Sequence, residues 1–290
     1  MIGALVRVSM LIVPNLSRAV RGRVLTSVSL SSFFACWADL RFVFVRFSGA
    51  TKRQFPEHAF RLKASPMPGY QVRLQHVSVI GGDDLNVRSL LDKQQFSDPV
   101  GEAAAAGISA ATWPLFGQLW PSSEKLADIM QTWALDGVTV LEIGCGLALA
   151  SLVVHRRLGD VTASDCHPLA ESFLKANLLL NELPALKYQT GHWGRDNETL
   201  GRFDLIIGGD VLYERGHPED LAGFIALHAN AVAEVLIIDP NRGHRSAFNK
   251  HMANHGFTLA ETAINEPMHD GSAYRGKRLH YRRAIAAARP

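Results

Sequence analysis

Cysteine is scarce in this chain, and long apolar runs are missing from it. Its three cysteines, Cys36, Cys145 and Cys166, are odd in number and show no Cys-x-x-Cys or Cys/His ligand spacing. Neither a disulfide framework nor a metal site is therefore indicated, and a reducing compartment is the simpler expectation. No stretch reaches the roughly 18 apolar residues that a membrane-spanning helix needs, so we expect a soluble protein without a membrane segment.

Acidic residues are nearly absent from the first 66 positions. Residues 1–66 hold 10 of the 30 Lys and Arg but only two of the 27 acids, Asp39 and Glu57, which leaves 20 bases and 25 acids for the rest. Nucleic-acid binding normally needs a surplus of clustered Lys and Arg. We therefore expect no broad nucleic-acid-binding face on the folded part. The composition does not exclude a small basic pocket.

The N-terminal segment, residues 1–66, also lacks a sustained helical or strand period. It is an organelle-targeting presequence, a family-specific extension, or upstream sequence read from a wrong start codon with Met67 as the true start. We favour the last two, and hence a cytoplasmic protein, with a mitochondrial location as the alternative. The length of 290 residues suits one main domain, which we place at 105–290 after a hairpin and linker at 67–104.

The segment before the main domain alternates apolar and polar residues. This pattern over 70–79, the turn residues at 81–84 and the short run at 85–91 predict a β-hairpin. The small, Ala-rich stretch 101–111 predicts a loop, and a helix is expected over 122–134, capped by Ser122 or Ser123.

From residue 138 onward, strand-length apolar runs alternate with helix-length segments. Such alternation is typical of βαβ units and predicts an α/β fold with a mainly parallel, Rossmann-like sheet covered on both faces. The last two runs, 256–264 and 277–284, are expected to form an antiparallel closing pair around a long turn.

A glycine turn follows the first strand of this domain. Gly144 and Gly146 permit a tight turn and close approach of a ligand at the mouth of the next helix. Asp165 ends the second strand 21 residues after Gly144, a spacing that places a carboxylate near ribose hydroxyls. Leu149 replaces the next glycine of a dinucleotide fingerprint and favours an adenosyl ligand without phosphates. An ordinary turn, with Asp165 as a helix cap, is the alternative.

Five motifs occur in a fixed order: VLEIGCG, SDCHP, a helix carrying Asn177 and Asn181, HWG, and GGDVLYE. Together they resemble the seven-strand S-adenosylmethionine-dependent methyltransferases, in particular the protein-lysine group that includes the enzymes acting on valosin-containing protein and on the electron-transfer-flavoprotein β subunit. The resemblance covers roughly residues 105–285, and LWPSSEKLA and IDPNRG reinforce it. It implies S-adenosylmethionine as cofactor and methyl transfer to lysine of a protein partner.

The resemblance also implies a set of cofactor-binding residues: Trp120, Glu142, Gly144, Cys145, Gly146, Asp165, Trp193 and Gly209. In this set the glycine turn lines the methionine part, Asp165 binds the ribose, and Trp193 lies beside the adenine. Trp120 is expected at the edge of the cofactor, and the backbone of Gly209 faces it. Plain core packing is the alternative for both tryptophans. Two departures from the family pattern are Ala148 in place of a third glycine and His192 before Trp193.

Asp210 and Tyr213 are the candidate catalytic residues, because they follow the strand FDLIIGGD at the sheet edge where ligands bind. Methyl transfer requires a neutral amine lone pair held in line with the methyl group. Lysine has a pKa of about 10.4, and a carboxylate alone would raise it. The resemblance therefore implies Asp210 as an orienting acceptor and Tyr213 as a hydrogen-bond partner or channel wall. The alternative is that Asp210 caps the next helix.

Asn241 and Arg242 follow the next strand at the same edge, so one of them could reach the substrate, although a solvated arginine is the simpler interpretation. The histidines, His251 and His255 included, show no coherent ligand set, so no metal is expected.

Three other functions compete with protein-lysine methylation. They are methylation of a small-molecule amine, regulation without catalysis, and dinucleotide-dependent redox chemistry. We expect no nucleic-acid or membrane partner; the oligomeric state stays open, with a monomer favoured.

Overall fold

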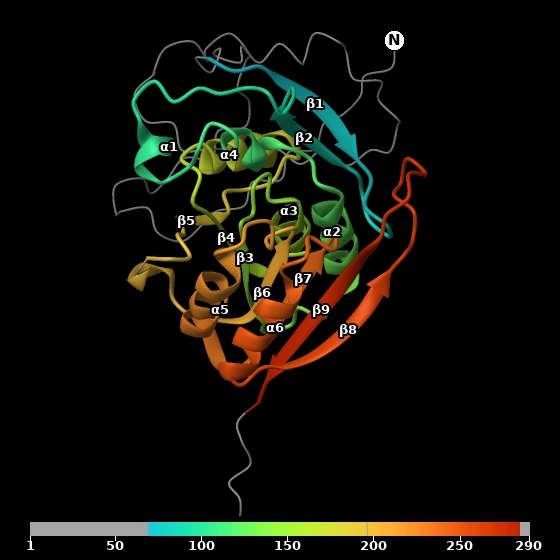
Figure 1. Ribbon diagram of the computed structural model, residues 1–290. Coiled ribbons are helices and arrows are strands. Elements are labelled where there is room, and N and C mark those ends of the chain that lie inside the picture. The colour runs from blue at the N-terminus through green and yellow to red at the C-terminus, as the bar shows by residue number, and fades with distance from the viewer. Residues whose placement is uncertain (1–68, 196, 285–290) are drawn as a thin grey trace, which may run out of the picture. The chain divides into compact units, whose positions relative to one another are not determined.

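The computed structural model describes residues 69–195 and 197–284 (Figure 1). The chain divides into two units after Leu62, and all described residues belong to the second. The predicted N-terminal extension, residues 1–66, therefore lies outside the described residues. Among the helices of the described part, none is long and apolar enough to span a membrane.

A seven-stranded sheet forms the centre of the domain, in the order β5-β4-β3-β6-β7-β9-β8 (Figure 1). All neighbouring strands from β5 to β7 are parallel, as the alternation predicts. The bounds in sheet order are Lys187–Thr190, Asp160–Asp165, Thr139–Ile143, Phe203–Gly209, Ala229–Asp239, Gly276–Arg283 and Thr258–Ile264. β9 is antiparallel to both its neighbours and lies between β7 and β8. The α/β fold with an antiparallel closing strand is thus confirmed, and the strand that closes the chain is not the edge strand.

Helices cover both faces of the sheet. On one face lie α2 (Pro121–Thr132), α3 (Leu149–Arg156) and α4 (Ala170–Leu180); on the other lie α5 (His217–His228) and α6 (Arg245–Asn254) (Figure 1). Ile206 and Ile207 of β6 are both fully buried, and they belong to the two opposite hydrophobic clusters. A strand buried on both faces explains why this part of the sequence is a continuous apolar run.

The predicted hairpin is formed by β1 (Val72–Val77) and β2 (Leu85–Leu90), which pair antiparallel. Asn177 of α4 and Asn181, the residue directly after this helix, hold it. Asn177 Oδ1 accepts a hydrogen bond from the backbone N–H of Arg88 at 2.7 Å, and Asn181 Oδ1 accepts one from that of Asn86 at 2.8 Å. The two side chains are one helical turn apart and satisfy backbone donors on the strand edge that β1 leaves free.

A short helix, α1 (Glu102–Ala105), and the 3-10 helix η3 (Trp113–Gly117) connect the hairpin to α2. The predicted serine cap of α2 is wrong. Trp120 is the N-cap residue and makes no side-chain cap, and Pro121 occupies the first turn, where its missing N–H costs nothing. The hydroxyl of Ser122 lies instead 2.9 Å from that of Tyr274, in a buried contact with the loop between β8 and β9.

Candidate active site

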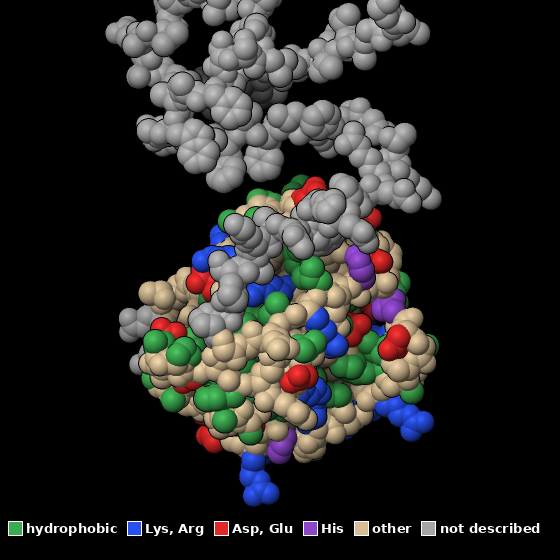
Figure 2. Space-filling view, turned by 90° about the horizontal axis from the view of Figure 1, so that it is seen from above, with side chains coloured by type: hydrophobic (Ala, Val, Ile, Leu, Met, Phe, Trp, Pro, Cys, Tyr) green, Lys and Arg blue, Asp and Glu red, His purple; other side chains and the backbone are tan. Residues whose placement is uncertain are grey.

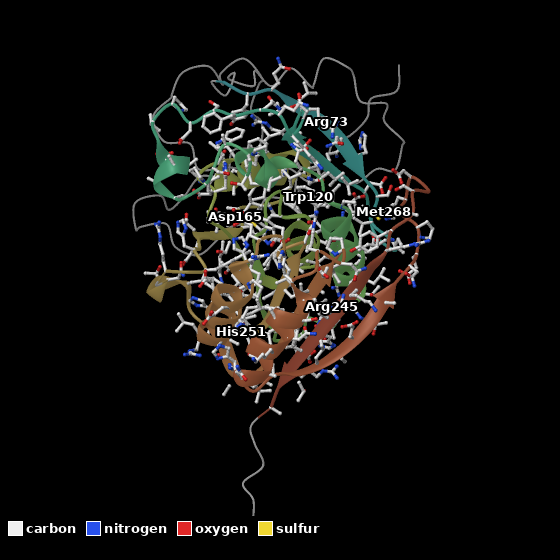
Figure 3. All side chains as sticks on the ribbon, viewed as in Figure 1. Arg73, Trp120, Asp165, Arg245, His251 and Met268 are labelled. Carbon is white, nitrogen blue, oxygen red and sulfur yellow. The ribbon has the colours of Figure 1, made fainter. Side chains whose placement is uncertain are left out.

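A cavity of about 430 Å³ lies at the carboxyl ends of β3, β4 and β6. Figure 3 shows Trp120 and Asp165 at this end of the sheet, whereas His251 lies toward the other end. Nine of the ten predicted site residues line the cavity: Trp120, Gly144, Cys145, Gly146, Asp165, Trp193, Gly209, Asp210 and Tyr213. The exception is Glu142. The fold therefore brings together residues spread over more than ninety positions of the sequence.

In the turn after β3, every second residue from 144 to 148 has a left-handed backbone conformation. Gly144 has φ 54°, Gly146 has φ 51°, and Ala148 has φ 59°. A Cβ atom on Gly146 would lie 2.7 Å from the carbonyl oxygen of Phe116, so this position has no room for a side chain. Ala148 occupies the place of the third glycine and accepts the left-handed conformation, which preserves the turn.

Asp165 joins the ends of β3 and β4. One carboxylate oxygen accepts a hydrogen bond from the backbone N–H of Gly146 at 2.8 Å, and the other accepts one from that of His167 at 2.9 Å. Burial raises the pKa of this carboxyl, and the two backbone donors oppose that rise. The alternative role as a helix cap is not seen, because Nδ1 of His167 accepts from the N–H of Leu169 at 3.1 Å instead.

His167 is a cavity residue that the sequence analysis missed. Its ring stacks on Phe116 at 3.6 Å between centroids, with 14° between the planes. Because Nδ1 accepts a hydrogen bond, Nε2 carries the proton, and this buried atom has no partner among the described residues. Burial lowers the pKa of His167 to about 3, so the ring is neutral at pH 7. The ring thus forms part of the cavity wall, whereas its unpartnered Nε2 atom is buried behind it.

Three aromatic rings in series form another part of the wall. Trp193 meets His217 edge-on at 5.0 Å, and Tyr213 meets the same ring edge-on at 4.9 Å. His217 also pairs with Glu214 at 3.1 Å, but burial lowers its pKa. Tyr213 keeps 39% of its surface exposed. The wall therefore runs from a partly buried indole to a phenol at the mouth of the cavity.

Trp120 lies at the cavity between two cations. Lys93 Nζ is 4.4 Å from its ring centroid, and the guanidinium carbon of Arg242 is 5.7 Å away. The indole N–H donates to the carbonyl of Leu115 at 2.9 Å. Both cations are within the range of attraction to an aromatic face, so the ring is fixed in orientation from several sides.

Asp210 follows β6 directly and has φ 58°, a conformation that aspartate tolerates better than most residues. It does not cap the next helix, because α5 begins only at His217. Its carboxylate is instead paired with Arg242, from Nε to one oxygen at 2.8 Å and from Nη2 to the other at 2.6 Å. Arg242 also lines the cavity, as the alternative to a solvated arginine requires.

Glu142 does not line the cavity. Its carboxylate points behind the glycine turn and accepts a hydrogen bond from the backbone N–H of Ser151 at 2.7 Å. Only 2% of the residue is exposed, and burial raises its pKa to about 7. The structure therefore places this residue beneath the site, at the first turn of α3.

The charges on the cavity wall are mixed, with an acidic excess. Four acids, Asp165, Asp210, Glu214 and Asp220, face two arginines, Arg195 and Arg242. Figure 2 shows a similar mixture of both signs on one face of the described surface. A wall with this balance suits a ligand with a positive centre better than a pyrophosphate, which needs excess donors or cations.

Comparison with known proteins agrees with this geometry. A family model described as lysine methyltransferase matches residues 105–254, more than half of the chain. The chain belongs to the lysine methyltransferase family. It is 28% identical over 163 residues to the electron transfer flavoprotein beta subunit lysine methyltransferase of Rattus norvegicus, covering 53% of this chain and 60% of that protein. The matched part is thus less than two thirds of this relative.

Two further proteins are similar to this chain, one over a shorter segment and the other at lower sequence identity. Histone-arginine methyltransferase METTL23 of Rattus norvegicus is 31% identical over 117 residues, 37% of this chain and 50% of that protein. A solved methyltransferase structure from Pyrococcus furiosus has 16% identity and a TM-score of 0.48, covering 58% of this chain and 88% of that one.

Membership of this family implies S-adenosylmethionine as the methyl donor, and the cavity residues fit that cofactor. Asp165 offers a buried carboxylate for ribose hydroxyls. Trp193 offers an aromatic face. When bound, the cofactor supplies an electrophilic methyl group on a positive sulfur, which the acidic excess of the wall accommodates.

Proposed function

We propose that the protein transfers a methyl group to the side-chain amine of lysine in another protein. The observation that carries this proposal is the position of Tyr213, which lines the cavity and is 39% exposed. The candidate catalytic end of the cavity thus opens to solvent. A lysine, with its four-carbon stem, can reach such a site from the surface of a partner.

The residues at this end suit an amine acceptor. The face of Tyr213 attracts a cation, which favours capture of an ammonium group at the mouth. Asp210 has a free lone-pair position on each oxygen beyond those used by Arg242, so it can accept an N–H of the neutral amine and orient its lone pair. The nitrogen then forms a bond to the methyl carbon while the carbon–sulfur bond breaks and its electron pair stays on sulfur.

Arginine is the second candidate acceptor, because the similarity to METTL23 concerns a histone-arginine methyltransferase. A guanidinium stays protonated throughout the physiological range, so it needs stronger acidic support at the acceptor than an amine does. The pairing of Asp210 with Arg242 removes that support, which favours lysine.

The full chain, incubated with methyl-labelled S-adenosylmethionine, tests this proposal. The acceptors are purified electron transfer flavoprotein, core histones and a cell lysate, and labelled proteins are hydrolysed to amino acids. Label in methyllysine is expected with the wild type and is expected to disappear with Asp165→Ala. Label in methylarginine, or only in small molecules, contradicts the proposal. Binding of the cofactor without any transfer would support a regulator in place of an enzyme.

A further inference from the structure

The ion pair between Asp210 and Arg242 is unusually well formed for a cavity wall. Both oxygens of the carboxylate are engaged by one planar guanidinium, at 2.8 and 2.6 Å. The Asp210 side chain is 6% exposed, whereas that of Arg242 is 40% exposed. A paired geometry of this kind fixes the carboxylate plane and neutralises its charge where the acceptor must bind.

The loop after β7 is built to present Arg242 at this position. Asp239, 1% exposed, accepts backbone N–H bonds from Asn241 at 3.1 Å and Arg242 at 3.5 Å. Asn241 has φ 65°, and its side chain contacts the carbonyl of Arg275 and the guanidinium of Arg245. The arginine is therefore held from behind by several contacts that do not involve Asp210.

Other charged groups around the pair come from every neighbouring element. Arg245 of α6 lies 3.8 Å from Asp239 and 3.3 Å from Glu261 of β8, so two carboxylates share it. Tyr274, from the loop between β8 and β9, interacts electrostatically with Arg242, and Tyr213, after β6, interacts with Asp210 and with Glu214. From the other side, Lys93 and Arg242 share the ring of Trp120, and Asp165 of β4 lies across the cavity. Asp210 is thus paired with Arg242, whereas Asp239 has only a share of Arg245.

We propose that Arg242 is a positioning residue that keeps Asp210 neutralised as a hydrogen-bond acceptor, so that the methyl acceptor binds as a neutral amine and not as an ammonium ion. The proposal rests on the proposed function, because it concerns an amine acceptor. An unpaired carboxylate at this place would form an ion pair with the ammonium ion and hold its proton. A carboxylate already paired with arginine offers lone pairs without that net charge.

The chemistry balances without a protein base. The ammonium ion loses one proton to water before it occupies the site, and the neutral nitrogen then donates its lone pair to the methyl carbon as the carbon–sulfur bond breaks. The product is a methylammonium ion, which the neutralised Asp210 does not retain. Arg242 affects these chemical steps only through Asp210.

Binding of n-butylamine, a mimic of the lysine side chain, tests the proposal without catalysis. The full chain is saturated with S-adenosylhomocysteine, and amine binding is followed by nuclear magnetic resonance from pH 7.5 to 9.5. For the wild type, affinity should rise with pH as the neutral amine becomes more abundant. Arg242→Gln should bind the probe about tenfold or more tightly at pH 7.5 than the wild type, because an unpaired carboxylate shifts an amine by about one pKa unit or more. Its affinity should be nearly independent of pH.

Two further variants separate this effect from general disruption. The double variant Asp210→Asn with Arg242→Gln restores neutrality and should return to the pH dependence of the wild type. Arg282→Gln removes an arginine that lies 3.5 Å from Glu234, away from the cavity, and should behave as the wild type. The proposal is overturned if Arg242→Gln binds the probe no more tightly than the wild type, or if the double variant keeps tight binding.

Kinetics with an acceptor protein identified by labelling give a second readout. At pH 7.5, Arg242→Gln should lower both kcat and KM, and kcat should recover toward pH 9.5 as the bound ammonium loses its proton. A merely structural role would lower kcat equally at all pH values. If the wild type methylates no protein, the proposed function fails, whereas the titration with n-butylamine still decides the role of Arg242.

Discussion

Replacing Glu142 by glutamine should stabilise the protein increasingly as pH rises. The carboxylate is 2% exposed, lies beneath the glycine turn, and accepts one backbone hydrogen bond from Ser151. Its pKa in the folded protein is raised by burial from an ordinary 4.5 to about 7. The fold therefore prefers the protonated form, whereas the unfolded chain ionises near pH 4.5. Stability from this group is lost as pH rises between these two values.

The size of the effect follows from the two pKa values of Glu142. At about 1.36 kcal/mol for each pKa unit, the rise from 4.5 to about 7 corresponds to about 3 kcal/mol above pH 7. Most of this, about 2.5 kcal/mol, develops between pH 5 and pH 8. Glutamine has no charge to desolvate, and its side-chain oxygen can still accept the backbone hydrogen bond. The advantage of Glu142→Gln over the wild type should therefore grow by about 2.5 kcal/mol across this range.

Urea denaturation at pH 5 and pH 8 measures this difference directly. Glu171→Gln is the matched control, because Glu171 lies in an exposed ion pair with Lys175 on α4 and should change stability little at either pH. Affinity for S-adenosylhomocysteine should stay close to that of the wild type, since Glu142 does not line the cavity. A free energy of unfolding with the same pH dependence in both proteins would refute the reasoning, as would loss of ligand binding in a folded variant.

Three other substitutions test the geometry of the site and its support. Gly146→Ala should destabilise the fold by about 2 kcal/mol or more in thermal unfolding, because its φ is 51° and the added Cβ would lie 2.7 Å from the carbonyl of Phe116; a variant with wild-type stability contradicts the described turn. Asp165→Ala should weaken S-adenosylhomocysteine about tenfold or more by calorimetry, because it removes a charged hydrogen-bond acceptor; unchanged affinity would remove Asp165 from the site. Tyr274→Phe should cost about 1 kcal/mol, because it breaks the buried contact with Ser122, and urea denaturation with no change would show that this contact contributes nothing.

Much of the fold could be predicted because its signals are local. The hairpin follows from alternation of side chains and a turn rich in glycine and aspartate, and the parallel sheet follows from apolar runs separated by helical segments. The position of β9 between β7 and β8 has no local signal, since it depends on which strand edge each segment reaches. The wrong cap of α2 has a similar cause. Ser122 is bound by Tyr274, which lies 152 residues away.

The site residues that belong to sequence motifs could be predicted. The contacts between side chains that are distant in the sequence could not. The glycine turn, Asp165, Asp210 and Tyr213 lie at strand ends, so their meeting at one cavity follows from the parallel sheet. The stacking of Phe116 on His167 escaped prediction, because it joins η3 to the distant end of β4. Arg242 could be named as a residue near the substrate, but its pairing with Asp210 could not be predicted, since a surface-loop arginine gives no sign of the carboxylate that it will meet.

Calorimetric titration of the full chain with S-adenosylmethionine, beside NAD and the variant Asp165→Ala, tests the central claim most directly. The described cavity predicts one site with micromolar affinity for S-adenosylmethionine, no comparable affinity for NAD, and a loss of at least about tenfold in the variant. A folded protein that binds no S-adenosylmethionine, or that prefers NAD, would contradict the assignment of this cavity as the methyl-donor site.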